Sequence, residues 1–408
     1  MVCGLLGRTL GHSYSPQIHA LLGDYTYRLF EKEPEEISNF LHSDDFTGIN
    51  VTIPYKKAVI EYCDQLTPIA QRLGAVNTIV KQKDGTLLGH NTDYFGFRST
   101  IERTGLCVSG KKALVLGSGG ASATAVAVLE DLGANVIVIS RSGENNYLNI
   151  AEHYDASLIV NATPVGMYPN TEASPLDLSP FSVLNGVIDL IYNPSRTALL
   201  QEAERCGIQA VNGLWMLVAQ AKESAEYFMD CKLDDGRITD IYHILKAQME
   251  NILLIGMPGS GKSTIGKLLA KKLGRAFCDI DQEIVLSAGC SIPEIFEKQG
   301  EEGFRQIETA VLGNVCRESR LVIATGGGCV TKERNYKLLH QNSTIFWLKR
   351  NIEDLPTEGR PLSQQNKLTD MYKIRKPLYE AFADHIIHNS STPEIVVDEI
   401  MRITKEDQ

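Results

Sequence analysis

Two glycine-rich turns of different design constrain the fold of this 408-residue chain more than any other feature of its sequence. Each turn follows a short apolar run. The first reads GSGGAS at 117–122 and follows ALVL at 113–116. The second reads GMPGSGKS at 256–263 and follows ILLI at 252–255. In each case a predicted strand leads through glycines into a helix, which directs backbone N–H groups toward a phosphate. The sequence therefore predicts two phosphate-bearing cofactors, and with them two chemistries.

The two turns suit different cofactors. Lys262 and Ser263 in the second turn suit a nucleoside triphosphate, because the lysine reaches the terminal phosphates and the hydroxyl binds Mg²⁺. The first turn has neither residue and suits a dinucleotide. The next predicted strand, 135–139, ends at Arg141, where NAD sites carry an acidic residue for the ribose diol. An arginine there favours the 2′-phosphate of NADP; the alternative is a solvated surface arginine.

Length and composition limit the function classes. A chain this long favours two or three domains, and the net charge of −10 argues against non-specific nucleic-acid binding. It has no apolar stretch of about 18 residues, so no membrane span is expected, and it begins without a signal-peptide pattern. Nine scattered cysteines without a CxxC pair indicate reduced thiols and a cytoplasmic enzyme.

The apolar pattern predicts an α/β organisation throughout. Candidate strands lie at 113–116, 135–139, 157–160, 186–190 and 208–211, followed by a helix at 214–228 and a second helix ending near 249. A new strand begins at 251 with almost no linker before it. We therefore expect a domain boundary there.

Upstream of the first turn, four polar clusters fall within the first hundred residues. They are GHSYSP at 11–16, NVTIPYK at 50–56, AVNT at 75–78 and GHNTD at 89–93. Many hydroxyls and amides around one lysine and one aspartate predict a pocket for a polyhydroxylated ring. Each cluster alone also fits ordinary turn chemistry.

Residues 1–248 resemble shikimate dehydrogenase. The shared motifs, in order, are HSxSP, NVTxPxK, AVNT, NTD, GxGGA, NATPxGM and GxxMLxxQ. The resemblance implies that Lys56, paired with Asp93, handles the proton while NADPH delivers hydride to the ketone of 3-dehydroshikimate. It implies that the hydroxyls and carboxylate of shikimate are bound by Ser13, Ser15, Asn50, Thr52, Asn77, Asp93, Tyr192 and Gln220.

The same resemblance implies the dinucleotide site and the architecture of the first half. NADP would be bound by Gly117, Ser118, Gly119, Gly120, Ala121, Ser122, Ser140, Arg141, Ser142, Asn161, Thr163, Met167 and Gly213. An open α/β substrate domain, residues 1–95 and 213–248, would enclose a Rossmann NADP domain, residues 96–212. The segment 141–161 is short for the family, and Ala123 and Asn145 replace basic residues that are common there.

Residues 249–408 are predicted to form a P-loop α/β domain with a parallel sheet, and from about 250 they resemble shikimate kinase. The P-loop is followed by DxD, FRxxE, GGG, RPL and RxPLY in that family's order. The implied ATP-binding residues are Gly256, Pro258, Gly259, Ser260, Gly261, Lys262, Ser263, Thr264 and Arg360, with Ser263 and Asp279 at Mg²⁺. The implied shikimate-binding residues are Asp281, Arg305, Gly327, Gly328 and Arg375.

The resemblance also implies roles within that second set. Asp281 would orient or deprotonate the 3-hydroxyl, Glu308 would position Arg305, and Lys262 and Arg360 would stabilise the transferring phosphoryl group. The lid segment 349–359 is shorter than is usual in the family, which predicts looser ATP binding.

The sequence thus predicts a bifunctional enzyme of the shikimate pathway that uses NADP(H), ATP and Mg²⁺. It would reduce 3-dehydroshikimate to shikimate and then phosphorylate shikimate to shikimate 3-phosphate, and its partners would be these small molecules, without nucleic acid or membrane. Two alternatives stay open. One is a quinate/shikimate dehydrogenase joined to another small-molecule kinase, and the other is a non-catalytic sensor of shikimate and nucleotide.

Overall fold

The structure is a computed structural model that describes residues 1–11, 13–355 and 365–406. The chain divides into two compact units, which are described separately below. Unit 1 contains Met1–Tyr192 and Leu199–Ile244, and unit 2 contains Asn193–Ala198 and Leu245–Gln408. Among the described residues, no helix combines the length and apolar character that crossing a membrane requires.

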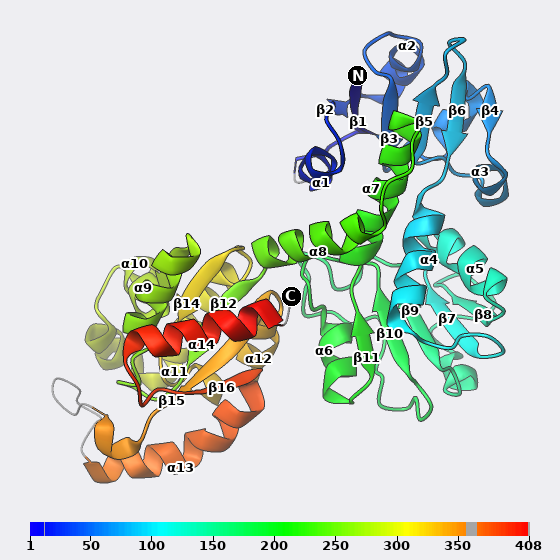
Figure 1. The fold of residues 1–408 in the computed structure, drawn as a ribbon. Helices are drawn as coiled ribbons and strands as arrows, with labels where there is room; N and C mark the ends of the chain where they lie inside the picture. Colours follow the sequence, from blue (N-terminus) through cyan, green and yellow to red (C-terminus); the bar gives the residue numbers. More distant parts are fainter. Residues whose placement is uncertain (12, 356–364, 407–408) are drawn as a thin grey trace. The chain divides into compact units, whose positions relative to one another are not determined.

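The amino-terminal part of unit 1 is a mixed six-stranded sheet in the order β2-β1-β3-β5-β6-β4 (Figure 1). Its strands are β1 (Val2–Gly7), β2 (Thr26–Glu31), β3 (Gly48–Val51), β4 (Gln65–Leu66), β5 (Thr78–Lys81) and β6 (Leu87–His90). The accompanying helices are α1 (Ser15–Leu22), α2 (Ile37–Leu41) and α3 (Pro68–Leu73). β5 pairs antiparallel with β3 and β6, which brings AVNT beside the ends of both neighbouring strands.

The second sheet of unit 1 is parallel and has the order β11-β10-β9-β7-β8. Its strands are β7 (Lys112–Leu116), β8 (Asn135–Ile139), β9 (Leu158–Asn161), β10 (Gly186–Asp189) and β11 (Gln209–Val211). Its helices are α4 (Asp93–Thr104), α5 (Gly120–Asp131) and α6 (Ala198–Arg205). The short segment between β8 and β9 contains only the 3-10 helix Ile150–His153, so β8 is left as an edge strand.

Two long helices end the first half, α7 (Leu214–Met229) and α8 (Gly236–Met249). α7 packs closely against α4 because Gly96 has no side chain. A Cβ at Gly96 would lie 2.8 Å from the carbonyl oxygen of Met216 and 3.0 Å from the Cβ of Gln220. This close approach brings Gln220 to the start of α4, where the NTD motif lies.

The sheet of unit 2 is parallel and has the order β13-β14-β12-β15-β16. Its strands are β12 (Asn251–Ile255), β13 (Ala276–Asp279), β14 (Leu321–Ala324), β15 (Ser343–Lys349) and β16 (His385–His388). Its helices are α9 (Lys262–Leu273), α10 (Ile280–Ala288), α11 (Ile292–Val315), α12 (Glu333–His340), α13 (Gln365–Phe382) and α14 (Pro393–Glu406).

Helices cover both faces of this last sheet, because successive residues of β12 point to opposite faces. Ile252 and Leu254 pack with α9 and α14, whereas Leu253 and Ile255 pack with α10, α11 and α13. A strand covered on both faces reads as a continuous apolar run, as the sequence of β12 does. The predicted α/β class, with a Rossmann-type domain and a P-loop domain, is confirmed.

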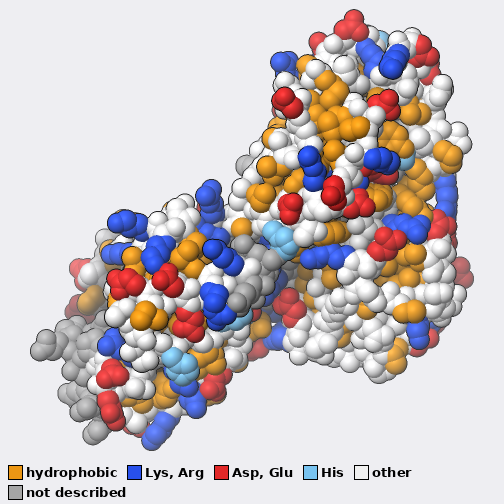
Figure 2. Space-filling model, in the orientation of Figure 1, with side chains coloured by type: hydrophobic (Ala, Val, Ile, Leu, Met, Phe, Trp, Pro, Cys, Tyr) orange, Lys and Arg blue, Asp and Glu red, His pale blue; other side chains and the backbone are white. Residues whose placement is uncertain are grey.

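Lysine and arginine side chains are interspersed with aspartate and glutamate over the side of the molecule that Figure 2 shows. With the net charge of −10, this mixture means that an anionic substrate must be held by a few locally placed cations. The sites below contain such cations.

Candidate active sites

An ion pair lies at the centre of the first site. The Nζ atom of Lys56, in the turn after β3, lies 2.6 Å from an Oδ atom of Asp93, the first residue of α4. Both side chains are mostly buried, with 28 % and 15 % of their surface exposed. The start of a helix favours a negative charge, and the carboxylate of Asp93 holds the ammonium of Lys56 in position. The pair can therefore supply a proton at a fixed place.

Neutral polar side chains connect this pair to α7. The Oδ1 atom of Asn77 accepts from the backbone N–H of Thr92 at 2.7 Å, and its Nδ2 atom lies 3.0 Å from the Thr92 hydroxyl. The same hydroxyl lies 3.3 Å from Oε1 of Gln220. Asn77, Asp93 and Gln220, which come from three separate motifs, are thus brought together.

Tyr27, which the sequence analysis missed, links the serine motif at 11–16 to the same region, because its hydroxyl interacts with both Ser15 and Asn50. Ser13 accepts a hydrogen bond from the backbone of Ser15 at 3.2 Å, and between them the ring of Tyr14 packs edge-on against Tyr192, with centroids 6.1 Å apart. Burial raises the pKa of Tyr27 well above its usual value, and a hydrogen bond with Ser15 acts in the opposite direction.

Asn50 is almost fully buried, and protein groups bind both ends of its amide. Its Oδ1 atom accepts from the hydroxyl of Tyr27 at 2.8 Å, and its Nδ2 atom lies 2.7 Å from Ser224 and 3.1 Å from Thr78. Thr52, two residues further, donates its backbone N–H to Leu6. One pattern could have pointed to Ser224: it lies four residues after Gln220, on the same face of a helix.

The dinucleotide turn has the geometry that its sequence predicts. Gly117 has φ = 107°, which favours glycine, and a Cβ there would lie 3.1 Å from the side chain of Thr163. The hydroxyl of Ser122 donates to the carbonyl of Gly117 at 2.7 Å, and α5 begins at Gly120. The first turn of α5 and the NATP motif therefore lie side by side, as a pyrophosphate site between β7 and β9 requires.

The other residues predicted to bind NADP have mixed environments. Asn161 is buried, and its side chain is bonded to Asp189, Val165 and Thr163. Met167 is exposed, and Gly213 lies so close to Leu190 that a Cβ would overlap its carbonyl. Asn161 and Gly213 therefore help to fix the conformation of the loops in which they lie.

The arginine predicted to bind the 2′-phosphate of NADP comes after the end of β8. Arg141 is exposed beside Tyr147, and Asn145 is paired with His153 at 3.0 Å. Sequence reasoning missed Arg72 of α3, which lines a hollow of about 360 Å³ together with Ser118, Ser122 and Ala123. Arg72 is itself paired with Asp131, the last residue of α5, at 2.7 Å.

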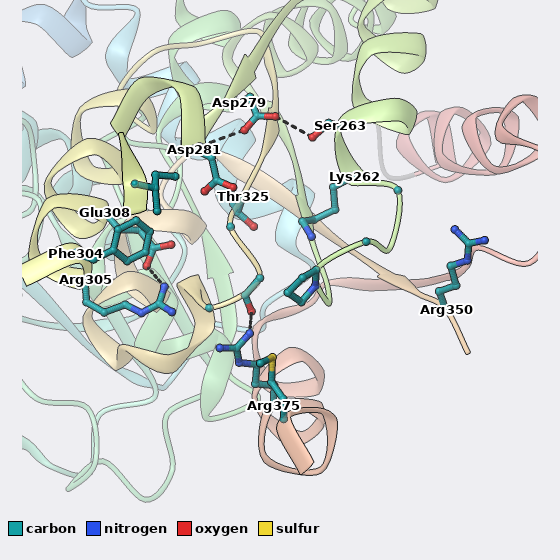
Figure 3. A pocket seen from close by; sticks show the side chains of 18 of the residues that line it. Lys262, Ser263, Asp279, Asp281, Phe304, Arg305, Glu308, Thr325, Arg350 and Arg375 are labelled. Carbon is teal, nitrogen blue, oxygen red and sulfur yellow. Dashed lines mark hydrogen bonds and ion pairs between the residues drawn. The ribbon is translucent and has the colours of Figure 1, made fainter. Parts of the chain in front are cut away.

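The second site is a pocket of about 610 Å³ at the carboxyl end of the parallel sheet (Figure 3). The ammonium of Lys262 lies 2.9 Å from the carbonyl oxygens of Gly256 and Met257, and the hydroxyl of Ser263 donates to Asp279 at 2.8 Å. The backbone N–H of Asp281 donates to the same Asp279. A hydroxyl and a carboxylate placed together at the P-loop form the donor set that Mg²⁺ prefers.

A buried ion pair forms the opposite end of this pocket. An Nη atom of Arg305 lies 2.7 Å from Glu308, and both residues face the same side of α11. Burial raises the pKa of Glu308, and the Arg305 guanidinium opposes that rise. A Cβ at Gly326 would lie within 3.0 Å of oxygens of both Glu308 and Asp281. A side chain at this position would require the two carboxylates to shift.

Two side chains of α13 form hydrogen bonds to the glycine loop at 326–328. Arg375 and Tyr379 both donate to the carbonyl of Gly327, at 3.1 Å and 2.5 Å. Figure 3 shows Arg305 and Arg350 at opposite ends of the pocket, which Arg350 also lines. The predicted lid residue Arg360 lies outside the described residues.

The residues present fit both predicted cofactors. The two loops carry positive-φ glycines before a helix start, at Gly117 and Gly261, and Lys262 and Ser263 add the charge and the hydroxyl that a triphosphate with Mg²⁺ needs.

Comparison with known proteins identifies both halves. A family model for the shikimate dehydrogenase substrate-binding domain matches residues 5–79, and one for shikimate kinase matches residues 258–405. A shikimate dehydrogenase (NADP(+)) from Clostridium beijerinckii is 34 % identical over 267 residues, which cover 60 % of this chain and 98 % of the relative. The chain belongs to the shikimate dehydrogenase family and carries a shikimate kinase domain.

Solved structures of the dehydrogenase family agree with the fold of the first half. Shikimate dehydrogenase 1 from Peptoclostridium difficile is 40 % identical, with a TM-score of 0.55, and the match covers 60 % of this chain and 97 % of that one. The enzyme from Thermus thermophilus, described in complex with NADP(H) and shikimate, is 30 % identical with a TM-score of 0.55, and the match covers 60 % and 99 %.

Proposed function

We propose that this chain reduces 3-dehydroshikimate to shikimate with NADPH and then phosphorylates shikimate at its 3-hydroxyl with MgATP. The observation that supports the proposal is that one chain holds two groups of residues suited to these two reactions. The Lys56–Asp93 pair lies among neutral polar groups in unit 1, and the P-loop faces Asp281 and Arg305 across one pocket in unit 2. The product of the first set is the substrate of the second.

In the dehydrogenase site the protein supplies binding groups and a proton. NADPH, when bound at 117–122, supplies the hydride. The Lys56 ammonium donates a proton to the oxygen of the ketone as negative charge develops on it, and Asp93 holds the ammonium in place. Ser13, Ser15 and Tyr192 would bind one side of the ring, and Thr52, Asn77 and Gln220 the other.

In the kinase site the protein supplies charge and a base. MgATP supplies the phosphoryl group, and Ser263 and Asp279 would hold the metal. The Asp281 carboxylate accepts the proton of the 3-hydroxyl, and Lys262 stabilises charge on the transferred group. Arg305 and Arg375 would bind the shikimate carboxylate, since guanidinium groups pair with carboxylates through two hydrogen bonds.

We also propose a division into three domains. Residues 1–95 with 213–248 form the substrate domain, residues 96–212 the NADP domain and residues 249–408 the kinase domain. Support comes from the three separate sheets, one in each range. Nine cysteines without a disulfide support a reducing compartment, the cytoplasm.

A coupled assay on the full chain tests the function. With 3-dehydroshikimate, NADPH and MgATP, we expect shikimate 3-phosphate; without ATP, we expect shikimate to accumulate. The matched variants Lys56→Ala and Lys262→Ala should each abolish one step and leave the other intact. Binding of both ligands without turnover by the wild-type chain would favour the sensor, and faster turnover of quinate than of shikimate would favour the first alternative.

A further inference from the structure

The hydroxyl of Ser224 is a hydrogen-bond node beneath the dehydrogenase site. Ser224 lies in α7 and has no exposed surface. Its Oγ atom lies 2.7 Å from Nδ2 of Asn50, 3.0 Å from the hydroxyl of Thr78 and 3.1 Å from that of Thr92. It also lies 2.9 Å from the carbonyl of Gln220, one helical turn earlier.

These partners come from four separate segments of the chain. Asn50 is on β3, Thr78 on β5, and Thr92 comes just before α4, while Ser224 and Gln220 are on α7. Three of these partners are, or adjoin, residues to which the proposed function gives a role in the site. Thr78 follows Asn77 in the chain, Thr92 precedes Asp93, and Gln220 is itself such a residue.

The partners of Ser224 include both hydrogen-bond donors and an acceptor, so the side chain at this position must be one that can donate and accept, as a hydroxyl does. A serine oxygen donates one hydrogen bond and accepts two, so it can donate to the Gln220 carbonyl while it accepts from Asn50 and from one of the two threonine hydroxyls. Thr92 extends the node by bonding to both Asn77 and Gln220. Loss of one buried hydroxyl would leave partners unsatisfied in a region that water does not reach.

We propose that Ser224 is a positioning residue of the dehydrogenase site, whose hydroxyl fixes Gln220 and Asn77 in the orientation that binds the hydroxyls of the substrate ring. The proposal rests on the proposed dehydrogenase function. Ser224 acts through its neighbours, whereas the Lys56–Asp93 pair shares no hydrogen bond with it. A defect at Ser224 should therefore appear in substrate binding more than in the proton-transfer step.

Steady-state kinetics of Ser224→Ala test this assignment, with oxidation of shikimate by NADP⁺ as the assay. We expect the KM for shikimate to rise about tenfold, while kcat changes less than about twofold and the KM for NADP⁺ is unchanged. The matched control is Thr100→Val. Thr100 is a buried helical hydroxyl of unit 1 that bonds to the carbonyl four residues earlier, at Gly96, as Ser224 does to Gln220. That control should keep the wild-type KM for shikimate.

A second variant keeps the test decisive if Ser224→Ala does not fold. Thr78→Val removes another hydroxyl of the node and should give the same KM signature. The double variant should lose less than the product of the two single losses, because both changes break one shared network. An unchanged KM in a folded single variant, a loss confined to kcat, or independent losses in the double variant would overturn the proposal. Absence of turnover in the wild-type chain would instead refute the proposed function.

Discussion

The two sites of this chain organise their polar groups in different ways. The dehydrogenase site surrounds the Lys56–Asp93 pair with neutral, buried side chains from β3, β5, α7 and the residues just before β5 and α4. The kinase site relies on charges at the carboxyl ends of neighbouring strands of one sheet, with the Arg305–Glu308 pair inside it. Neutral networks depend on exact packing between segments. Charged sites depend on keeping each buried charge paired.

The largest effects should come from the two lysines, because each contributes charge or a proton to the reaction itself. Lys56→Ala should lower the dehydrogenase kcat about 10²–10⁴-fold, and Lys262→Ala should lower the kinase kcat about 10²–10³-fold. Separate assays of each step on each variant measure this. A comparable loss in both activities from either change would contradict two independent catalytic sets.

Glu308→Gln should be the most destabilising of the remaining changes. It leaves the Arg305 guanidinium buried beside a neutral amide, and breaking a buried pair costs about 3–5 kcal/mol. Urea unfolding gives the change in free energy. Glu302→Gln is the control, because Glu302 pairs with Lys332 at 2.6 Å on the surface, where a pair contributes about 1 kcal/mol or less. Equal losses in the two variants would argue against a buried charged pair.

Gly96→Ala should test the close approach of α4 and α7. A Cβ would lie 2.8 Å from the Met216 carbonyl, so the helices must move apart, at a cost of about 1–3 kcal/mol. The KM for shikimate should rise with it, since Gln220 moves away from Thr92. Gly313→Ala in α11 has room, with the nearest atom at 3.8 Å, and should be neutral or slightly stabilising. An unaffected KM in Gly96→Ala would show that the helix contact does not set the site.

The smallest effect concerns pH. Burial lowers the pKa of His19 from 6.5 to about 3. Between these values the unfolded chain binds a proton that the folded chain does not, so this residue makes stability fall as the pH falls. The loss should be about 1 kcal/mol between pH 7 and 5.5. Urea unfolding of wild type and His19→Gln at both pH values measures it, and the variant should show a weaker dependence. Identical pH dependence would contradict a neutral buried His19.

The sequence predicted much of the chemistry because the residues concerned are close together in the chain. Arg305 and Glu308 are one helical turn apart, and Asp279 ends strand β13, with Asp281 two residues later. The predicted strands of the Rossmann domain agree with β7 to β11 within about two residues at each end. The sequence also predicted that the chain between β8 and β9 is shorter than is usual in the family, because it has too few residues there to form another helix and strand.

Contacts between distant segments could not be predicted in the same way. Nothing local marks Ser224 as the partner of Asn50, 174 residues away, or places Arg72 beside the dinucleotide turn. The sequence by itself determined the two glycine turns, their cofactor chemistry and the identity of the charged groups, because backbone conformation and charge follow from local residues. Only the tertiary structure decided which neutral side chains share a hydrogen bond, because that depends on how closely α7 packs against α4 and against the first sheet.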